Sequence, residues 1–222
     1  MVNQDRICVI GCGDVFECIS ADYLSYQFSS NDWEFRPVSS PAEISTSAVQ
    51  LLQGLSVEEV KLFIAVDYNA LNYARLELYY VARLKGYKFT TLVHNTAKCD
   101  HSKMGENVWI GPNTYIAPNT LIGNNVVINA CTRLDQGVEI DSHVWIGAGS
   151  TISRNTKVGS NTVIGNDVNI GEAITIGKHC MINKPGIWQD AMPNGSFWES
   201  SYTEPAKIVG KGYSFDNSRT IK

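Results

Sequence analysis

Aliphatic residues recur at every sixth position over about eighty residues, and this repeat limits the chain to very few folds. Isoleucine, valine, leucine or methionine occupies each of the positions 104, 110, 116, 122, 128, 134, 140, 146, 152, 158, 164, 170, 176 and 182. The residue two places earlier is always Ser, Thr, Val, Ile or Cys, as in Thr114 and Val126. A six-residue period without a slip is typical of a parallel β-helix.

Each six-residue unit predicts one short strand and one turn. We expect the aliphatic residue and the residue two places before it to point inward and to stack on their equivalents in the next coil. Gly or Asn after the strand suits a tight corner. Three units close a triangular coil of eighteen residues. The fourteen units of the repeat therefore predict between four and five coils. An antiparallel sandwich is the alternative, but its strands would not hold a six-residue register over this length.

The composition suits a globular protein and argues against several classes of function. Hydrophobic residues make up 44% of the chain and the net charge is −4. No basic run is present, so we expect no nucleic acid partner. No apolar stretch approaches the roughly 20 residues of a membrane span, and the N-terminus lacks the apolar segment of a signal peptide. The six cysteines show no metal-ligand spacing, which favours reduced thiols in a cytoplasmic protein and no metal site.

Residues 1–93 follow a different pattern and predict a small α/β domain. The expected elements are strands at 6–10, 33–38, 62–66 and 87–93, helices at 14–26 and at 69–85 with Gly86 at its end, and a capping-box pattern at 56–59 that favours a helix start. Alternating strands and helices indicate a Rossmann-like domain with a parallel sheet.

The end of the first predicted strand carries the candidate substrate-binding residues Gly11, Cys12 and Gly13. A glycine-rich turn of this kind can place a phosphate at a helix N-terminus. A full dinucleotide fingerprint would have a third glycine near position 16, where Phe16 lies, so a simple tight turn is the alternative. Asp67 follows another predicted strand, where such sheets bind ligands, but it fits a loop acid or the cap of the next helix equally well.

The hexapeptide pattern ends at Lys184-Pro185-Gly186, which predicts a β-helix domain at 94–186 and a tail at 187–222. The tail carries four aromatic residues: Trp188, Phe197, Trp198 and Tyr202. We expect them to cap the open end of the β-helix core. Stacking on a sugar or an adenine is the alternative.

Several segments together resemble the NeuD-like and PglD-like family of sugar acyltransferases. The quoted segments are Val-Ile-Gly-Cys-Gly at 9–13, Leu-Val-His-Asn-Thr-Ala at 92–97, which is similar to the family's His-Pro-x-Ala entry, the loop at 63–69 followed by Arg75, and the end segments at 191–196 and 205–207. The resemblance implies a left-handed β-helix that packs as a homotrimer. It also implies acetyl transfer from acetyl-CoA to a nucleotide-linked sugar in surface-glycan biosynthesis, with the nucleotide on the N-terminal domain and CoA in the groove between neighbouring coils.

One position departs from the family pattern. Gln136 stands where the family has a histidine that acts as the general base, and Asp135 lies beside it. A glutamine side chain cannot accept a proton at neutral pH. His143 and His101 are candidates to replace that base across a subunit interface, and His179 shares a corner of the repeat with His143.

An amine acceptor removes much of the need for a base, because an amine with a pKa of roughly 8 is partly neutral at pH 7. We therefore predict N-acylation of an amino sugar, with Gln136 and Asp135 orienting the amine. O-acetylation with a borrowed histidine and an inactive trimeric scaffold remain as alternatives. By position, the resemblance places Trp145, Asn166 and Lys184 in the CoA groove.

The expected outward positions of the β-helix carry a row of apolar residues: Trp109, Tyr115, Val127, Trp145 and Val163. Few monomers expose a row of this kind. The pattern therefore predicts burial of these side chains between the subunits of the homotrimer.

Overall fold

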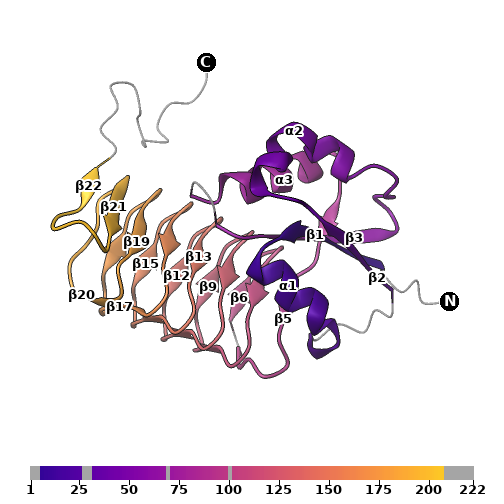
Figure 1. Cartoon of the computed structure of the whole chain (residues 1–222). Coiled ribbons are helices and arrows are strands. Elements are labelled where there is room, and N and C mark those ends of the chain that lie inside the picture. Colours follow the sequence, from indigo (N-terminus) through magenta and orange to yellow (C-terminus); the bar gives the residue numbers. More distant parts are fainter. Residues whose placement is uncertain (1–5, 27–31, 69–70, 100–101, 208–222) are drawn as a thin grey trace, which may run out of the picture.

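The computed structural model describes residues 6–26, 32–68, 71–99 and 102–207. They form an α/β part followed by a left-handed parallel β-helix, with the two parts packed against each other (Figure 1). The predicted fold class is confirmed. None of the helices in these ranges combines the length and the hydrophobicity that crossing a membrane requires.

The α/β part has a four-stranded parallel sheet in the order β2-β1-β3-β4. Its strands are β1 (Arg6–Cys12), β2 (Trp33–Pro37), β3 (Val60–Val66) and β4 (Lys88–Phe89), and its helices are α1 (Asp14–Ala21), the short 3₁₀ helix η1 (Tyr23–Ser25), α2 (Pro41–Leu51) and α3 (Tyr73–Leu84). Apolar side chains of α2 and α3 bury one face of the sheet, and those of α1 contact the other face. The two central strands, β1 and β3, are buried on both faces, which explains their nearly continuous apolar runs.

The sequence analysis missed helix α2. The helix begins after Ser40, with Pro41 in its first turn, where a missing N–H group leaves no hydrogen bond unmade. The Glu43 carboxylate accepts a hydrogen bond from the backbone N–H of Ser39 at 2.9 Å. The capping-box pattern at 56–59 instead forms a turn that leads into β3. In this turn the Ser56 carbonyl accepts hydrogen bonds from the backbone N–H groups of Glu59 and Val60.

Three further boundaries differ from the prediction. The helix predicted at 14–26 ends at Ala21 and is followed by η1. The helix predicted at 69–85 begins only at Tyr73, because Leu71 and Asn72 adopt φ values of 58° and 65° in the left-handed region; Asn69 lies outside the described residues. The strand predicted at 87–93 is divided into β4, which joins the α/β sheet, and a strand that joins the β-helix.

The β-helix has three faces, each a sheet of short parallel strands. Face 1 contains β5 (Leu92–Val93), β7 (Trp109–Ile110), β10 (Val127–Ile128), β13 (Trp145–Ile146), β16 (Val163–Ile164), β19 (Met181–Asn183), β21 (Ser196–Glu199) and the antiparallel β22 (Ala206–Lys207). Face 2 contains β8 (Tyr115–Ile116), β11 (Arg133–Leu134), β14 (Thr151–Ile152), β17 (Val168–Ile170) and β20 (Gly186–Trp188). Face 3 contains β6 (Lys103–Met104), β9 (Leu121–Ile122), β12 (Glu139–Ile140), β15 (Lys157–Val158) and β18 (Thr175–Ile176).

The core of the β-helix is built as the repeat predicts. Between β6 and β20 the paired strands are eighteen residues apart, as Ile128 and Ile146 are. From 110 to 182 every sixth residue is buried, and so is every residue two places earlier. A glycine after the strand is needed where coils approach closely: a Cβ atom at Gly147 would lie 2.5 Å from the carbonyl carbon of Gly165.

The backbone turns each corner at a position other than that of the glycine just described. The residue at this position lies three places after the inward aliphatic residue and has a positive φ, as at Asn119 (62°), His143 (65°) and Asn161 (58°). Asparagine tolerates this left-handed backbone better than most residues. We call the corner between faces 1 and 2 corner A, that between faces 2 and 3 corner B, and that between faces 3 and 1 corner C.

The end of the β-helix differs from the prediction, because the coils continue beyond Gly186. Trp188, Met192 and Trp198 stack in register on Ile170, Ile176 and Ile182. The two indole rings meet edge to face at 4.6 Å. Trp188 and Trp198 therefore cover the core as a further coil. Of the other two aromatic residues expected to cap it, Phe197 packs against the cluster on face 1 and Tyr202 is exposed.

The row of apolar residues predicted to be buried between subunits is instead buried largely within the chain, on face 1. Trp109, Val127, Trp145 and Val163 share one buried cluster with apolar residues of β1, β3 and α1. The α/β part of the same chain thus packs on this face and covers it. Tyr115, on face 2, is the member of the row that stays exposed.

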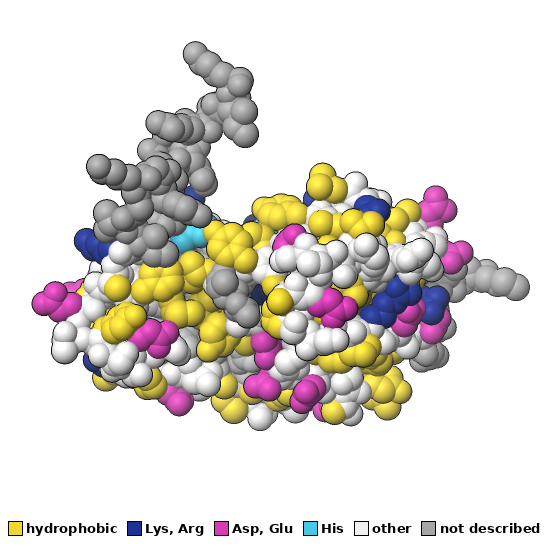
Figure 2. All heavy atoms as spheres, turned by 45° about the horizontal axis from the view of Figure 1, so that its top comes forward, with side chains coloured by type: hydrophobic (Ala, Val, Ile, Leu, Met, Phe, Trp, Pro, Cys, Tyr) yellow, Lys and Arg dark blue, Asp and Glu magenta, His cyan; other side chains and the backbone are white. Residues whose placement is uncertain are grey.

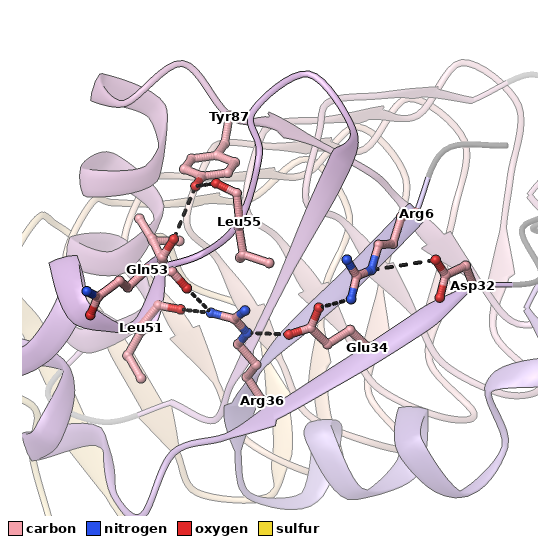
Figure 3. Close-up of polar contacts among 9 residues, drawn as sticks. Arg6, Asp32, Glu34, Arg36, Leu51, Gln53, Leu55 and Tyr87 are labelled. Carbon is pink, nitrogen blue, oxygen red and sulfur yellow. Dashed lines mark hydrogen bonds and ion pairs between the residues drawn. The ribbon is translucent and has the colours of Figure 1, made fainter. Parts of the chain in front are cut away.

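The edge of the α/β sheet is fixed by charges (Figure 3). Glu34 pairs with Arg6 and with Arg36, each at 2.6 Å. Arg36 Nη1 also donates to the carbonyl groups of Leu51 and Gln53 at 2.9 Å, which are exposed at the C-terminal end of α2. These bonds attach α2 to the edge strand β2.

Candidate functional site

Corner B carries Gln136 and Asp135. The Gln136 side chain is exposed, and within the described residues no hydrogen bond to its amide is recorded. Asp135 points outward, where its carboxylate accepts a hydrogen bond from Arg133 Nε at 2.7 Å. The Arg133 guanidinium in turn lies 5.8 Å from the centre of the Tyr115 ring. This part of corner B thus presents an amide, which cannot accept a proton near pH 7, and a carboxylate paired with Arg133.

His143 lies on corner C, at another edge of the prism from Gln136. Its ring is 7% exposed and packs against Tyr79 and Tyr80 of α3, each at 5.6 Å between ring centres. Its Nδ1 lies 3.0 Å from Nδ2 of Asn125 and its Nε2 lies 3.5 Å from the Tyr80 hydroxyl. The fold therefore separates the predicted catalytic residues within one chain. His101, the other candidate base, lies outside the described residues.

Burial, and after it the positive charge of Arg75, lowers the pKa of His143 to about 4. A general base works best with a pKa near the working pH. A histidine with such a low pKa stays neutral at physiological pH but attracts a proton weakly. His143 is therefore better suited to hold a hydrogen bond than to remove a proton.

The lowered pKa predicts a specific loss of stability in acid. Below pH 6.5 the unfolded chain binds a proton that folded His143 rejects, so the unfolding free energy should fall by about 3 kcal/mol as the pH approaches 4. Urea unfolding at pH 7 and pH 4.5 should show this slope in the wild type and a clearly smaller one in His143→Gln. An NMR titration in which the His143 ring protonates near pH 6.5 would contradict the prediction.

Trp145, predicted to line a CoA groove, lies on face 1 and is only 5% exposed. Its ring contacts Tyr68 at 5.4 Å between ring centres, and the Arg75 guanidinium lies 5.6 Å from its centre. The α/β part covers this side chain, so within one chain it offers no surface to CoA. Trp145 is a contact between the two parts of the molecule.

Asn166 and Lys184 stack on corner A in successive coils. Asn166 is exposed and accepts a hydrogen bond from the backbone N–H of Ala148 at 2.9 Å. Lys184 borders a cavity of about 720 Å³ at the end of the β-helix. Its ammonium lies 5.5 Å from the centre of the Trp198 ring. Trp188 and Lys207 line the same cavity, which therefore combines indole rings with two cations.

The turn after β1 is tightly built around Gly11 and Gly13. A Cβ atom at Gly11 would lie 1.8 Å from the carbonyl oxygen of Ala65. The Asp67 carboxylate accepts hydrogen bonds from the backbone N–H groups of Asp14 at 2.7 Å and Val15 at 3.1 Å. Burial, partly offset by these two bonds, raises the pKa of Asp67.

Asp67 is thus the cap of α1, whereas the sequence suggested a cap for the helix that follows it. Its carboxylate occupies the N–H groups that the prediction assigned to a phosphate. A phosphate at this helix terminus would have to displace a carboxylate of the same charge. Cys12, at the end of β1, is half-buried beside this turn, and burial, followed by the negative charge of Asp67, raises the pKa of its thiol.

The sequence analysis named Arg75 and His143 but did not predict that polar groups of α3 contact the β-helix. Arg75 is fully buried and donates to the Val144 carbonyl at 3.3 Å, while its Nε and Nη1 have no partner. Burial lowers its pKa to about 9. Asn72, also fully buried, donates to the His143 carbonyl at 2.9 Å. The sequence held two separate signals: the resemblance around Arg75, and the eighteen-residue spacing of Asn125 and His143. Neither one shows that α3 packs on this corner.

Solved structures with this fold match nearly the whole chain. The acetyltransferase domain of PglB from Neisseria gonorrhoeae has a TM-score of 0.70 at 19% identity, covering 86% of this chain and 95% of that chain. A perosamine N-acetyltransferase from Caulobacter crescentus, in complex with CoA and GDP-perosamine, has a TM-score of 0.66 at 20% identity, covering 86% and 92%. WeeI from Acinetobacter baumannii has a TM-score of 0.55 at 16% identity, covering 86% and 95%. At these identities the likeness establishes the shared fold.

The sequence comparisons are narrower. A family model described as the GMPPB C-terminal domain matches residues 90–194, which is the β-helix without the α/β part. No curated protein matches the chain.

Proposed function

We propose that this protein transfers an acetyl group from acetyl-CoA to the amine of a nucleotide-linked amino sugar. The cavity at the end of the β-helix is the observation that carries the proposal. CoA has an adenine that can stack on an indole ring and phosphates that pair with lysines, and Trp198, Lys184 and Lys207 offer these groups together. The fold shared with the acetyltransferase domain of PglB and with perosamine N-acetyltransferase supports the same activity.

Asn166 would extend the CoA site along corner A, one coil below Lys184. We do not include Trp145 in it, because the α/β part buries that side chain. The nucleotide of the acceptor would lie at the carboxyl edge of the α/β sheet, near Gly11, Cys12 and Gly13. Because Asp67 already caps α1, its carboxylate would accept hydroxyl or N–H groups of the nucleotide and would repel a phosphate.

The proposed chemistry needs no protein base. The neutral amine nitrogen attacks the thioester carbonyl carbon, the C–S bond breaks, and the departing thiolate takes the proton that the nitrogen loses. Gln136 and Asp135 would orient the amine by accepting its N–H groups. O-acetylation through His143 is the weaker alternative, since its low pKa disfavours proton removal.

Replacing Gln136 with alanine is expected to lower turnover by about ten- to a hundredfold at most, which does not exceed the lower limit of the roughly 10² to 10⁴ that a general base contributes. The measurement is CoA release with a panel of nucleotide-linked amino sugars, and Gln50→Ala on the exposed face of α2 is the matched control. The rate should rise with pH until the acceptor amine is neutral and then level off.

Two other outcomes would replace this function. If His143→Asn abolished turnover while CoA and the acceptor still bound, a borrowed histidine would be the base and O-acylation would return. If no amino sugar were acetylated and CoA did not bind, the chain would be a scaffold that has lost catalysis.

We also propose a homotrimer in the cytoplasm. The trimer now depends on the family resemblance and on the exposed faces 2 and 3, since face 1 is covered within the chain. Cys8, Cys12, Cys18, Cys131 and Cys180 form no disulfide, which fits a reducing compartment. Light scattering that gave a monomer at micromolar concentration would rule out the trimer.

A further inference from the structure

A polar groove of about 590 Å³ lies between α3 and corner C of the β-helix. Tyr79, Tyr80 and Arg83 line it from α3, and its other wall is formed by corner residues of successive coils: Asn124, Asp141, Ser142, His143, Ser160, Asn161, Lys178 and His179. The face shown in Figure 2, with the top of Figure 1 turned forward, carries histidine (cyan) near the place where the α/β part meets the β-helix. None of the residues assigned above to CoA or to the acceptor amine lines this groove.

A chain of hydrogen bonds with a fixed direction ends at the groove. The backbone N–H of Ile64 in β3 can only donate, and it donates to Oδ1 of Asn107 at 2.8 Å. Asn107 Nδ2 therefore faces Oδ1 of Asn125 at 2.7 Å. Asn125 Nδ2 then donates to Nδ1 of His143 at 3.0 Å.

This direction sets the tautomer of His143. Because Nδ1 accepts a hydrogen bond, the proton of the neutral ring resides on Nε2. Nε2 lies 3.5 Å from the Tyr80 hydroxyl and points its N–H toward that oxygen. The Tyr80 hydrogen is then free to point into the groove. Hydrogen bonds in a chain polarise one another, so Tyr80 becomes a stronger donor than an isolated phenol.

The charges around the groove favour an anion beside this donor. Lys178 lines the groove, and among the described residues no carboxylate forms an ion pair with it. Arg83 is already paired with Glu106, which also accepts the Tyr79 hydroxyl. Asp141 is the opposing charge, and it lies at the exposed rim.

We propose that this groove binds the phosphate groups of a phosphate-bearing ligand, with Lys178 and the Tyr80 hydroxyl as the groups that contact them. In terms of the proposed function, on which this identification rests, the ligand is the diphosphate of the nucleotide-linked acceptor. The geometry at Asp67 supports this placement, because the carboxylate there excludes a phosphate from the start of α1. Asn161 Oδ1, which is shielded from solvent and has no partner, would accept a hydroxyl group of the same ligand.

Calorimetry with GDP and with inorganic pyrophosphate, both without acyl-CoA, tests the proposal. Lys178→Gln should weaken both ligands by about tenfold or more, as the loss of a charge-assisted contact does, and Tyr80→Phe should weaken them by roughly threefold to tenfold. Lys157→Gln is the matched control: it removes the same charge from face 3, where Lys157 pairs with Glu139 at 2.9 Å, and it should leave both affinities unchanged.

Three results would overturn the proposal. The first is that Lys178→Gln binds both ligands as tightly as the wild type does. The second is that neither ligand binds the wild type at millimolar concentration. The third is that Lys178→Gln loses affinity for CoA but not for GDP or pyrophosphate. Loss of GDP binding in Asp67→Asn with Lys178→Gln unaffected would return the phosphate to the turn after β1. The binding experiment contains no acyl donor, so its result does not depend on acetyl transfer. The groove can therefore be shown to bind diphosphate even if acetyl transfer is never detected.

Discussion

Replacing Gly11 with valine is expected to destabilise the α/β part by at least about 4 kcal/mol, a loss reserved for severe steric or backbone defects. The first atom of any side chain at this position would lie 1.8 Å from the carbonyl oxygen of Ala65, in the neighbouring strand. Neither strand can retreat, because β1 is paired on both sides by β2 and β3. Chemical unfolding, together with amide exchange of β1 and β3, measures the effect.

Gly54→Val is the control for this prediction. Gly54 has a positive φ, of 78°, which Gly11 does not have, but no atom lies within 4 Å of its added Cβ. The control should therefore lose only the roughly 1–3 kcal/mol of an unfavourable backbone conformation. A Gly11→Val protein as stable as the control would show that the strands can separate at this point. It follows that lost nucleotide binding in Gly11→Val would report a damaged sheet and could not identify a phosphate contact.

Replacing Trp145 with alanine should cost about 3–5 kcal/mol, the usual range for removing a large buried aromatic side chain. The ring fills the contact between face 1 and the α/β part, where it meets Tyr68 and Arg75. Its loss would also leave the fully buried Arg75 guanidinium without the ring beside it. The measurement is urea unfolding, with CoA affinity determined on the folded variant.

Trp198→Ala is the matched variant at the end cavity, where the ring is only half-buried. It should lose less stability than Trp145→Ala, but its affinity for CoA should fall by about tenfold, as the loss of one stacking contact with a base does. Trp145→Ala should keep its CoA affinity. If Trp145→Ala weakened CoA more than Trp198→Ala did, the CoA site would lie on face 1 and the cavity would have another ligand.

The sequence predicted most accurately those features that depend on stacking of one coil on the next. A side chain at an inward position meets its equivalents eighteen residues away, so the register of Ile128 on Ile146 follows from spacing alone. The coil containing Trp188 and Trp198 was harder to identify, because indole rings replace the aliphatic residues and the spacing shortens. Helix α2 was missed because its start signal at Ser40-Pro41 is local and weak beside the continuous hexapeptide pattern.

The candidate site was only partly predictable. Lys184 and Trp198 were both identified from the sequence, but their meeting in one cavity depends on the final coil. The absence of a base at Gln136 can be read directly, since it is a property of one side chain. The environment of His143 could not be read, because the residues that bury it, Tyr79 and Tyr80, belong to a helix more than sixty positions earlier.

The sequence by itself determined the β-helix, its inward residues, its three faces and the glutamine at the family's histidine position. These follow from contacts between equivalent positions of a repeat, which the period specifies. Only the tertiary structure decided that the α/β part covers face 1, that Asp67 caps α1, and that corner C and α3 form a polar groove. Each of these depends on how two segments with unrelated patterns dock, and the docking is set by the shape and polarity of whole surfaces, which no local period encodes.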